Sequence, residues 1–299
     1  MSYTELGADL FNANLAKTDN GGKYHLPVHP VGDAVPKLIH QCFFGARTFS
    51  DDLAANVESI KSLNPDWRHT LYDEQMMKEF IVNNYGREFL RYYDRINPKY
   101  GAARADFFRY LLLYKVGGVY LDIKSTVAQP FDDFIRPDDR YILAQWDDPD
   151  NPDRIGWGKH KELAHVENGE FQQWHIICAP GHPFLRAVIL SVMSNIDRYL
   201  PWRDGTGAYG TFKLTGPIAY TLAIDPLRDS NSHRFINTGE AGLEYSIFSK
   251  RSHTALFTSH YFRLTDPIVR LGPVLSMISR IRQTSRKAKG FVRRRMVLQ

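Results

Sequence analysis

Strand-like and helix-like segments alternate along the first part of this chain, and this alternation limits the folds open to it. Residues 35–45 contain β-branched and aromatic side chains and end in a glycine, which is typical of a strand. Apolar residues recur at helical spacing over residues 53–63, and residues 67–72 again favour a strand. A second helix is expected from Asp73 to about Val82. This order predicts an α/β fold in which helices cover a mostly parallel sheet.

The next segment carries the strongest signal in the chain. Residues 101–116 predict a helix with apolar positions turned toward the core, and two glycines end it. Residues 119–121 are then typical of a buried strand, with Asp122 at its carboxyl end. Ligands of open α/β sheets bind beyond the carboxyl ends of the strands, so Asp122 stands where a ligand is expected.

Two polar residues of this helix complete a candidate site. Asp106 and Arg109 are three residues apart and therefore share one face of the helix. We expect them to meet Asp122 in one cleft, where an Asp–Arg pair can hold sugar hydroxyls and a carboxylate can hold a divalent cation that screens a diphosphate. The alternative is an ordinary helix ion pair beside an aspartate that starts a turn.

The second half of the chain is less regular. A strand is expected over residues 174–178 and a helix over residues 183–200, with no internal repeat. With 43% hydrophobic residues the chain can bury one sizeable core. We therefore predict a single domain over residues 35–265, preceded by a polar arm, residues 1–34, and followed by a basic tail, residues 266–299.

Charge is unevenly distributed along the sequence. Its 299 residues include 38 Lys and Arg against 33 Asp and Glu, a net charge of +5. Residues 266–299 contain nine Lys or Arg and one Asp, or +8, which leaves 5 − 8 = −3 for the rest. A nearly neutral body argues against a general nucleic-acid-binding surface, and no nucleic-acid partner is expected.

Targeting and redox features favour a cytoplasmic protein. No stretch approaches the roughly 18 uninterrupted apolar residues of a spanning helix. The start of the chain lacks a basic region followed by an apolar one, so no secretory signal is predicted. We expect Cys42 and Cys178 to remain reduced thiols.

The motifs around the candidate site resemble glycosyltransferase family 32, which includes Och1-like mannosyltransferases and bacterial capsular polysaccharide enzymes. The family's Ser-Asp-x-x-Arg element is matched by Ala-Asp-Phe-Phe-Arg at residues 105–109. Its Gly-Gly-x-Tyr-x-Asp-x-Asp element is matched by Gly-Gly-Val-Tyr-Leu-Asp-Ile-Lys at residues 117–124. The resemblance runs from about Val35 to His260. Further segments that match the family in the same order are residues 35–41, 64–67, 179–184 and 215–217.

This resemblance implies a GT-A fold and a retaining transfer of a hexose from a UDP- or GDP-sugar. It implies that Asp106 and Arg109 hold the donor sugar and act in catalysis. It also implies that Asp122, the first acid of a DXD-type motif, belongs to a site for Mn²⁺ or Mg²⁺ and the diphosphate. A cation there favours departure of the nucleotide, because negative charge accumulates on the diphosphate in the transition state.

One position departs from the family pattern. Lys124 stands where the second metal-binding aspartate is expected, and a protonated lysine cannot ligate a metal. Either the ion is held by Asp122, water, phosphate and a later residue, or Lys124 itself neutralises phosphate. We favour an ion that is still used but held more weakly; the alternative is a degenerate site in which Lys124 points into solvent.

A metal ligand from the C-terminal part of the chain is expected in this fold. His253 and His260 fall in the right region, and His260 is preferred because it follows a strand-like stretch, residues 255–257. The alternative is a histidine that only makes structural hydrogen bonds.

Further donor contacts are predicted at two other places. His40, Gln41 and Phe43, with the adjacent Phe44, can border the nucleotide base, although adjacent aromatic residues are also common in core packing. Gly216 lies in the matched Thr-Gly-Pro segment and is added to the donor-binding residues.

Two other patterns are set aside. Residues 205–210 satisfy G-x-G-x-x-G, but no buried strand is predicted before them, so a dinucleotide fingerprint is not indicated. His160 and His165 are five residues apart, whereas a zinc site on one helical face needs a spacing of four.

Residues 267–299 mix apolar residues with clustered Lys and Arg. Such a basic amphipathic stretch can lie on an anionic membrane surface, which predicts a peripheral contact at the inner face of the membrane. The alternative is a solvated tail.

The function that we predict from sequence is a metal-assisted hexosyltransferase that extends a polysaccharide, lipid-linked oligosaccharide or lipopolysaccharide, so that its acceptor is a glycan or glycolipid. A toxin-like transferase that glycosylates a protein is the first alternative. The second is a nucleotide-sugar-binding protein of the same fold that has lost turnover, an option motivated by Lys124.

Overall fold

A six-stranded sheet forms the centre of the computed structural model, which describes residues 23–44, 49–146, 156–248 and 264–279. Its strand order is β2-β1-β3-β6-β5-β7. The strands are β1 (Leu38–Cys42), β2 (Arg68–Tyr72), β3 (Gly118–Leu121), β5 (Tyr141–Leu143), β6 (His175–Cys178) and β7 (Arg234–Phe235). Neighbouring strands are parallel except where β6 is one of the pair. The predicted α/β fold with a mostly parallel sheet is therefore confirmed.

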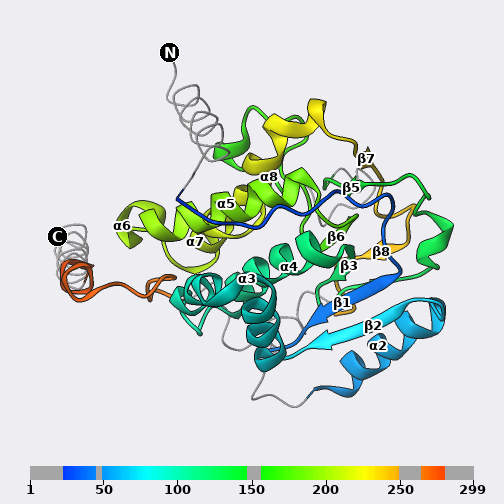
Figure 1. Cartoon of the computed structure of the whole chain (residues 1–299), viewed down its shortest axis with the longest axis horizontal. Helices are drawn as coiled ribbons and strands as arrows, with labels where there is room; N and C mark the ends of the chain where they lie inside the picture. The colour runs from blue at the N-terminus through cyan, green and yellow to red at the C-terminus, as the bar shows by residue number, and fades with distance from the viewer. Residues whose placement is uncertain (1–22, 45–48, 147–155, 249–263, 280–299) are drawn as a thin grey trace, which may run out of the picture.

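Helices precede and follow these strands, and a small two-stranded sheet lies beside them (Figure 1). The small sheet pairs β4 (Thr126–Val127) with β8 (Leu243–Glu244). The α-helices are α2 (Asp51–Leu63), α3 (Glu74–Arg95), α4 (Gly101–Val116), α5 (Pro183–Arg198), α6 (Pro201–Asp204), α7 (Gly207–Leu214) and α8 (Pro217–Ile224). Short 3-10 helices are η1 (Phe131–Asp133), η3 (Lys161–Leu163) and η4 (Asp225–Ser230).

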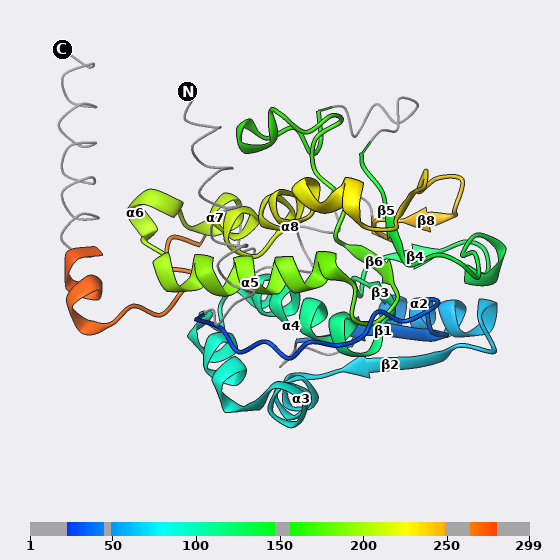
Figure 2. The same cartoon turned by 45° about the horizontal axis from the view of Figure 1, so that its top comes forward.

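The main sheet separates two hydrophobic cores. Side chains alternate along a strand, so neighbouring residues of one strand pack on opposite faces. Val119 and Leu121 of β3 join the core on the side of Ile60 in α2, whereas Tyr120 joins the core on the side of Phe107 in α4. Figure 2 shows α3, α4 and α5 gathered together, with α2 beside β1 and β2.

Helix α4, which contributes the polar residues Asp106 and Arg109 to the site, is deeply buried. All twelve residues from Ala103 to Tyr114 are buried, and the helix packs against α3 and α5. A helix that is apolar on nearly all sides has to be enclosed on all sides. The charged residues Arg104, Asp106 and Arg109 are therefore buried with it, and each needs a partner.

The helix predicted from Asp73 to about Val82 extends further. Asp73 caps α3 as expected, accepting a hydrogen bond from the Met76 backbone N–H at 2.8 Å. The segment then runs to Arg95 and is interrupted at Gly86, whose φ of 81° is left-handed. The buried aromatic residues of the second part pack into the core, and this tertiary contact favours a longer segment than the local pattern predicts.

Parts of the predicted arm and tail belong to the packed body. In the arm, Leu26 is buried in the main core, and the Gly32 N–H donates to the carbonyl of Pro180. In the tail, Ile268 and Val269 are buried in the same core. These two residues are therefore not available to an exposed apolar face, and any such face of the predicted amphipathic stretch begins after Val269. Among the described helices, none has the length and apolar character needed to cross a membrane.

Candidate active site

The carboxyl ends of β1 and β3 and the first half of α4 border a pocket of about 1050 Å³. Gly117 alone separates the end of α4 from Gly118, the first residue of β3, and this tight turn brings Asp122 back to the pocket from the far end of β3. A side chain at Gly118 would collide with the Leu38 carbonyl at 2.6 Å, so the close approach of β3 to β1 requires glycine there. The pocket contains Asp106, Arg109 and Asp122, the three residues predicted to meet.

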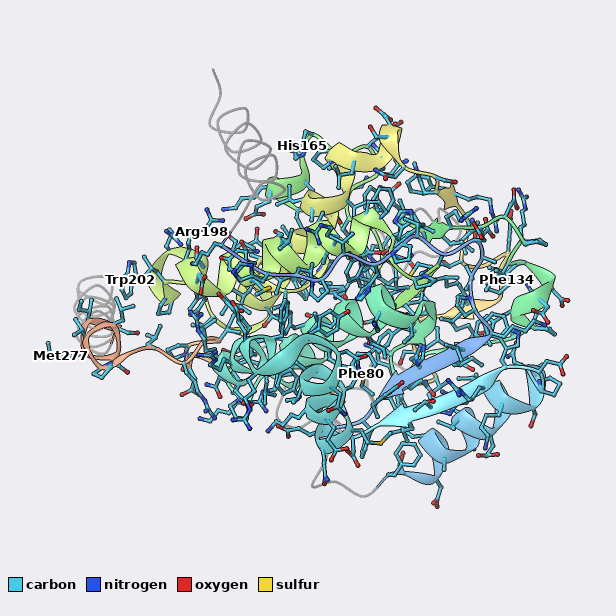
Figure 3. The ribbon with its side chains drawn as sticks, in the orientation of Figure 1. Phe80, Phe134, His165, Arg198, Trp202 and Met277 are labelled. Atoms are coloured by element: carbon cyan, nitrogen blue, oxygen red, sulfur yellow. The ribbon has the colours of Figure 1, made fainter. Side chains whose placement is uncertain are left out.

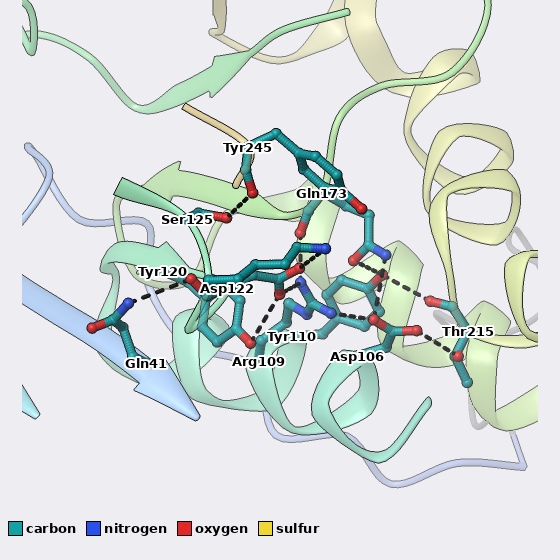
Figure 4. A network of polar contacts seen from close by, with 11 residues as sticks. Gln41, Asp106, Arg109, Tyr110, Tyr120, Asp122, Ser125, Gln173, Thr215 and Tyr245 are labelled. Carbon is teal, nitrogen blue, oxygen red and sulfur yellow. Dashed lines mark hydrogen bonds and ion pairs between the residues drawn. The ribbon is translucent and has the colours of Figure 1, made fainter. Parts of the chain in front are cut away.

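Arg109 connects the two carboxylates (Figure 4). Its Nη2 forms an ion pair with Oδ1 of Asp106, and its Nη1 donates to Oδ1 of Asp122 at 3.1 Å. The guanidinium also donates to the Gln173 carbonyl at 2.7 Å and lies 4.6 Å from the centre of the Tyr120 ring. The two aspartates and the arginine therefore meet in one cleft, as expected, and the arginine joins the two carboxylates.

Asp106 is almost fully enclosed by partners. Its Oδ2 accepts a hydrogen bond from the Thr215 hydroxyl at 2.8 Å, and its Oδ1 accepts one from Gln173 Nε2 at 3.3 Å. Burial raises the pKa of Asp106, while Arg109 and Thr215 oppose this effect. These contacts fix the carboxylate at the pocket wall, because each of its oxygens is held by a neighbour.

Burial lowers the pKa of Arg109, but the adjacent Tyr120, Asp106 and Asp122 together raise it well above its ordinary value. The guanidinium therefore carries its positive charge inside the protein. A permanently charged, planar donor held between two carboxylates gives the pocket wall a fixed arrangement of polar groups.

Asp122 is the more accessible of the two carboxylates. Its side chain is 27% exposed, compared with 3% for Asp106. Its backbone is pinned on both sides, since its N–H donates to the Trp174 carbonyl and its carbonyl accepts from Gln41 Nε2 at 3.4 Å. Within the described residues, the hydrogen bonds to its carboxylate, from Arg109 and Tyr120, both go to Oδ1.

Lys124 lines the pocket rather than turning away from it. Its side chain is only 13% exposed, and its Nζ lies 4.0 Å from Oδ2 of Asp122 and 3.8 Å from the centre of the Tyr245 ring. The loop that carries it is anchored, because the Lys124 carbonyl accepts from Ile247 N–H and the Ser125 hydroxyl donates to the Tyr245 carbonyl. Two cations and two anions thus meet at this point of the pocket, and their charges sum to zero.

The described residues supply only part of a metal site. No group of three or more His, Cys, Asp or Glu side chains in these residues is arranged to hold an ion. Oδ2 of Asp122 is the carboxylate oxygen that remains for a cation, with Lys124 close to it. The predicted ligand His260, like His253, lies outside the described residues.

His40 and Gln41 lie behind the pocket wall. His40 is buried, with its Nε2 3.1 Å from the Gly117 carbonyl, and Gln41 pairs with His69. Neither residue is among those that line the pocket, so the structure gives no support to their predicted contact with the nucleotide base. Burial lowers the pKa of His40 to about 4, which keeps the imidazole neutral in the interior.

Phe43 and Gly216, two residues predicted to contact the donor, both line the pocket. Phe43 packs edge-to-face on Phe49, with the ring centres 5.0 Å apart. Gly216 lies so close to the preceding helix that a side chain there would meet the Phe212 Cα at 2.9 Å. Its place at the pocket therefore depends on the absence of a side chain.

Several pocket residues were not predicted from the sequence. They are Gln173, which donates to Asp106, and the aromatic residues Trp146, Trp157 and Tyr245. His160 is another, and its Nε2 lies 2.8 Å from Oε2 of Glu170. Thr215, which also holds Asp106, was likewise not predicted and lies behind the pocket wall. One signal was available: Trp146 follows β5 closely, at the same edge of the sheet where Asp122 follows β3.

The G-x-G-x-x-G segment lies in a helical setting. Residues 201–204 form α6, and α7 begins at Gly207, so a helix stands where a dinucleotide-binding fingerprint needs a strand.

Comparison with known proteins connects this geometry to a family. A family model described as a glycosyltransferase sugar-binding region containing a DXD motif matches residues 50–142. The initiation-specific alpha-1,6-mannosyltransferase of Schizosaccharomyces pombe is 27% identical over 213 residues, which cover 68% of this chain and 50% of the relative. Inositol phosphoceramide mannosyltransferase 2 of the same organism is 33% identical over 189 residues, which cover 63% of this chain and 46% of the relative. The chain thus spans about half the length of these relatives.

Among solved structures, the PaToxG glycosyltransferase aligns over 91% of this chain and 90% of its own, with 17% identity and a TM-score of 0.47. The resemblance inferred from residues 103–124 is confirmed by the family match, whose matched region includes them.

Proposed function

Because residues 50–142 belong to the glycosyltransferase family whose sugar-binding region contains a DXD motif, we propose that this chain transfers a hexose from a nucleotide-sugar to an acceptor hydroxyl. The observation that supports this proposal most is the shared pocket of Asp106, Arg109 and Asp122, joined by the Arg109 guanidinium. Fixed charged donors and acceptors of this kind can orient sugar hydroxyls and can stabilise charge that develops during transfer.

The three residues are proposed to have different tasks. Asp106 is held by Arg109, Thr215 and Gln173, and such a rigid carboxylate at a pocket wall suits the positioning of the donor sugar. Asp122 is partly exposed at the strand end and suits the diphosphate side of the donor. The curated relatives are named mannosyltransferases, so mannose-bearing donors are the first to test.

Departure of the nucleotide places negative charge on the diphosphate, and the pocket has to offset it. We propose that Lys124 supplies positive charge for this purpose, since its Nζ lies inside the pocket beside Asp122. The family's motif implies a divalent cation, and Oδ2 of Asp122 is the oxygen that would ligate it. When bound, such an ion screens the same phosphate charge, so we expect a weaker dependence on the ion than in a site with two aspartates.

The acceptor is proposed to be a glycan or glycolipid, and the transfer to proceed with retention, as the family resemblance implies. The stereochemical course is tested by the coupling constant of the anomeric proton in the product, measured by NMR. An inverted anomeric centre would contradict retention without affecting the proposed donor site.

A peripheral membrane contact through the tail is also proposed. Residues 273–279 are helical, and Val274 and Met277 are 67% and 60% exposed. The sequence that follows contains eight Lys or Arg and no Asp or Glu over residues 280–299. Exposed apolar side chains next to clustered cations fit the surface of an anionic bilayer.

The donor proposal is tested by thermal unfolding in the presence of a panel of UDP- and GDP-hexoses, with and without Mn²⁺. A ligand that binds the native state raises the midpoint of unfolding, and at 100 times its Kd it adds about 2.7 kcal/mol. We expect one base and sugar combination to stabilise the protein. If no member of the panel shifts the midpoint, the proposed donor site is wrong.

A further inference from the structure

The pocket extends along one edge of the main sheet. Strands β1, β3 and β5 are parallel to one another, so their carboxyl ends lie at the same edge. Phe43 follows β1, Asp122 follows β3 and Trp146 follows β5, and all three line the pocket. Because neighbouring strands are roughly 4.8 Å apart, the end of β5 lies about 10 Å beyond that of β3, on the side away from β1.

Three aromatic side chains gather at this far end. Trp146 lies edge-to-face against Trp157, with ring centres 5.0 Å apart, and against Tyr245 at 5.4 Å. Trp157 and Tyr245 are 5.8 Å apart, so each ring contacts both others. We call these three residues the aromatic cluster. They line the pocket and are only half-buried, unlike the aromatic residues of the main core.

Polar side chains hold the cluster and border it. The Trp146 Nε1–H donates to Oε1 of Glu170 at 2.6 Å, and the other oxygen of Glu170 lies 2.8 Å from His160 Nε2. His160 and Glu170 also line the pocket. Aromatic surface combined with a few fixed polar groups is the lining expected for a ligand that has both apolar and hydroxylated faces.

The aromatic cluster is adjacent to the proposed reaction centre. Lys124 Nζ lies 3.8 Å from the centre of the Tyr245 ring and 4.0 Å from Asp122 Oδ2. A ligand on the cluster is therefore one side chain away from the carboxylate assigned to the donor diphosphate. Phe43, which is predicted from the sequence to border the nucleotide base, follows β1 and so lies on the opposite side of β3.

From this arrangement we propose that Trp146, Trp157 and Tyr245 form an acceptor subsite that binds a pyranose ring by stacking. One face of a pyranose carries several C–H bonds with partial positive charge, which is attracted to the negative face of an aromatic ring. His160 and Glu170 are the neighbours that can bond its hydroxyls. The acceptor is therefore a carbohydrate rather than a protein side chain. This inference rests on the proposed function, because the subsite is defined relative to the donor.

The test uses methyl hexopyranosides of the gluco, manno and galacto series as acceptor probes, with the protein saturated by the nucleoside diphosphate that stabilises it. Saturation-transfer NMR reports which sugar protons contact the protein, and a titration gives Kd. We expect the C–H protons of one face to respond. Trp157→Ala should weaken binding of the probe roughly 2- to 12-fold, and Trp157→Phe should weaken it less.

Trp202→Ala serves as the matched control, since Trp202 lies on α6 and does not line the pocket (Figure 3). Its probe affinity should equal that of the wild type. Nucleotide affinity, measured in parallel, should be unchanged in Trp157→Ala.

Three results would overturn the inference. They are the absence of any probe signal in a protein that binds nucleotide, equal probe affinity in Trp157→Ala, and a loss of nucleotide affinity in Trp157→Ala, which would assign the cluster to the base. A protein that binds no nucleotide-sugar would instead contradict the proposed function itself, and the two failures are thus distinguished.

Discussion

Removal of the Lys124 charge should weaken nucleotide binding most clearly when no divalent ion is present. Lys124→Met keeps an unbranched side chain of similar length and deletes the positive charge. Nζ lies 4.0 Å from Asp122 Oδ2 and offsets part of the negative charge of this carboxylate. Without Nζ, Asp122 repels an incoming diphosphate more strongly. Both effects act in the same direction, because the variant loses an attraction and leaves a repulsion.

The size of the effect follows from the enclosure of Lys124. Its side chain is only 13% exposed, so solvent screens its interactions less than those of a surface lysine. A hydrogen bond to a charged group contributes about 1.5–3 kcal/mol, which corresponds to a rise in Kd of about 12- to 150-fold. We expect this change for the nucleoside diphosphate measured by isothermal titration calorimetry in EDTA.

A second variant tests the relation to the metal. Lys124→Asp restores the second acid of a DXD motif, and we expect it to bind nucleotide poorly in EDTA and to regain affinity with Mn²⁺. Lys61→Met is the control, because Lys61 is paired with Glu58 on α2 and does not line the pocket. Wild-type affinity of Lys124→Met in EDTA would refute the reasoning, as would complete loss of wild-type binding in EDTA.

Three further predictions concern stability and the tail. Arg109→Met should lower the free energy of unfolding in urea by about 3 kcal/mol, because two carboxylates lose their shared cation; an unchanged value would contradict this role. Burial raises the pKa of Asp197, but hydrogen bonds from Lys23 and Arg95 lower it to about 2, so its contribution is present above pH 3.8 and is lost as the pH falls toward 2. Asp197→Asn should lower the free energy of unfolding by about 1 kcal/mol at neutral pH, after allowance for solvent screening, and should reduce the loss of stability between pH 3.8 and pH 2. The same loss of stability over this pH range in wild type and variant would contradict the prediction. Deletion of residues 273–299 should reduce sedimentation with anionic vesicles and leave thermal unfolding unchanged, and equal sedimentation would refute a membrane contact.

The central part of the site could be predicted because its signals are local. Asp106 and Arg109 share a helix face through their spacing. Gly117, which caps α4, and Gly118, which begins β3, direct the chain back so that Asp122 ends beside them. These relations need only a few consecutive residues. The fold class followed in the same way, from alternation of strand and helix patterns along residues 35–122.

His40 and Gln41 show where strand-end reasoning needs exact boundaries. Both lie within β1, which continues to Cys42, so their side chains are enclosed by neighbouring strands and helices. The part of this segment that lines the pocket begins at Cys42, the last residue of β1, and continues with Phe43. A shift of one or two residues along a strand decides whether a side chain meets the ligand or the core.

The aromatic cluster could not be found from sequence because its members come together only in the folded protein. Trp146 follows β5, Trp157 lies in a loop, and Tyr245 follows β8. No periodicity relates these positions. The 3-residue strand β5 and the 2-residue strand β8 give weak local signals as well.

The most direct test of the central claim is release of nucleoside diphosphate from the UDP- or GDP-hexose that stabilises the protein. Wild type is compared with Asp122→Ala and with Asp66→Ala, an exposed aspartate outside the pocket. We predict release by wild type and by Asp66→Ala, and a release rate at least about 100-fold lower for a folded Asp122→Ala protein. Release by Asp122→Ala at the wild-type rate would contradict the assignment of this pocket as the site of transfer.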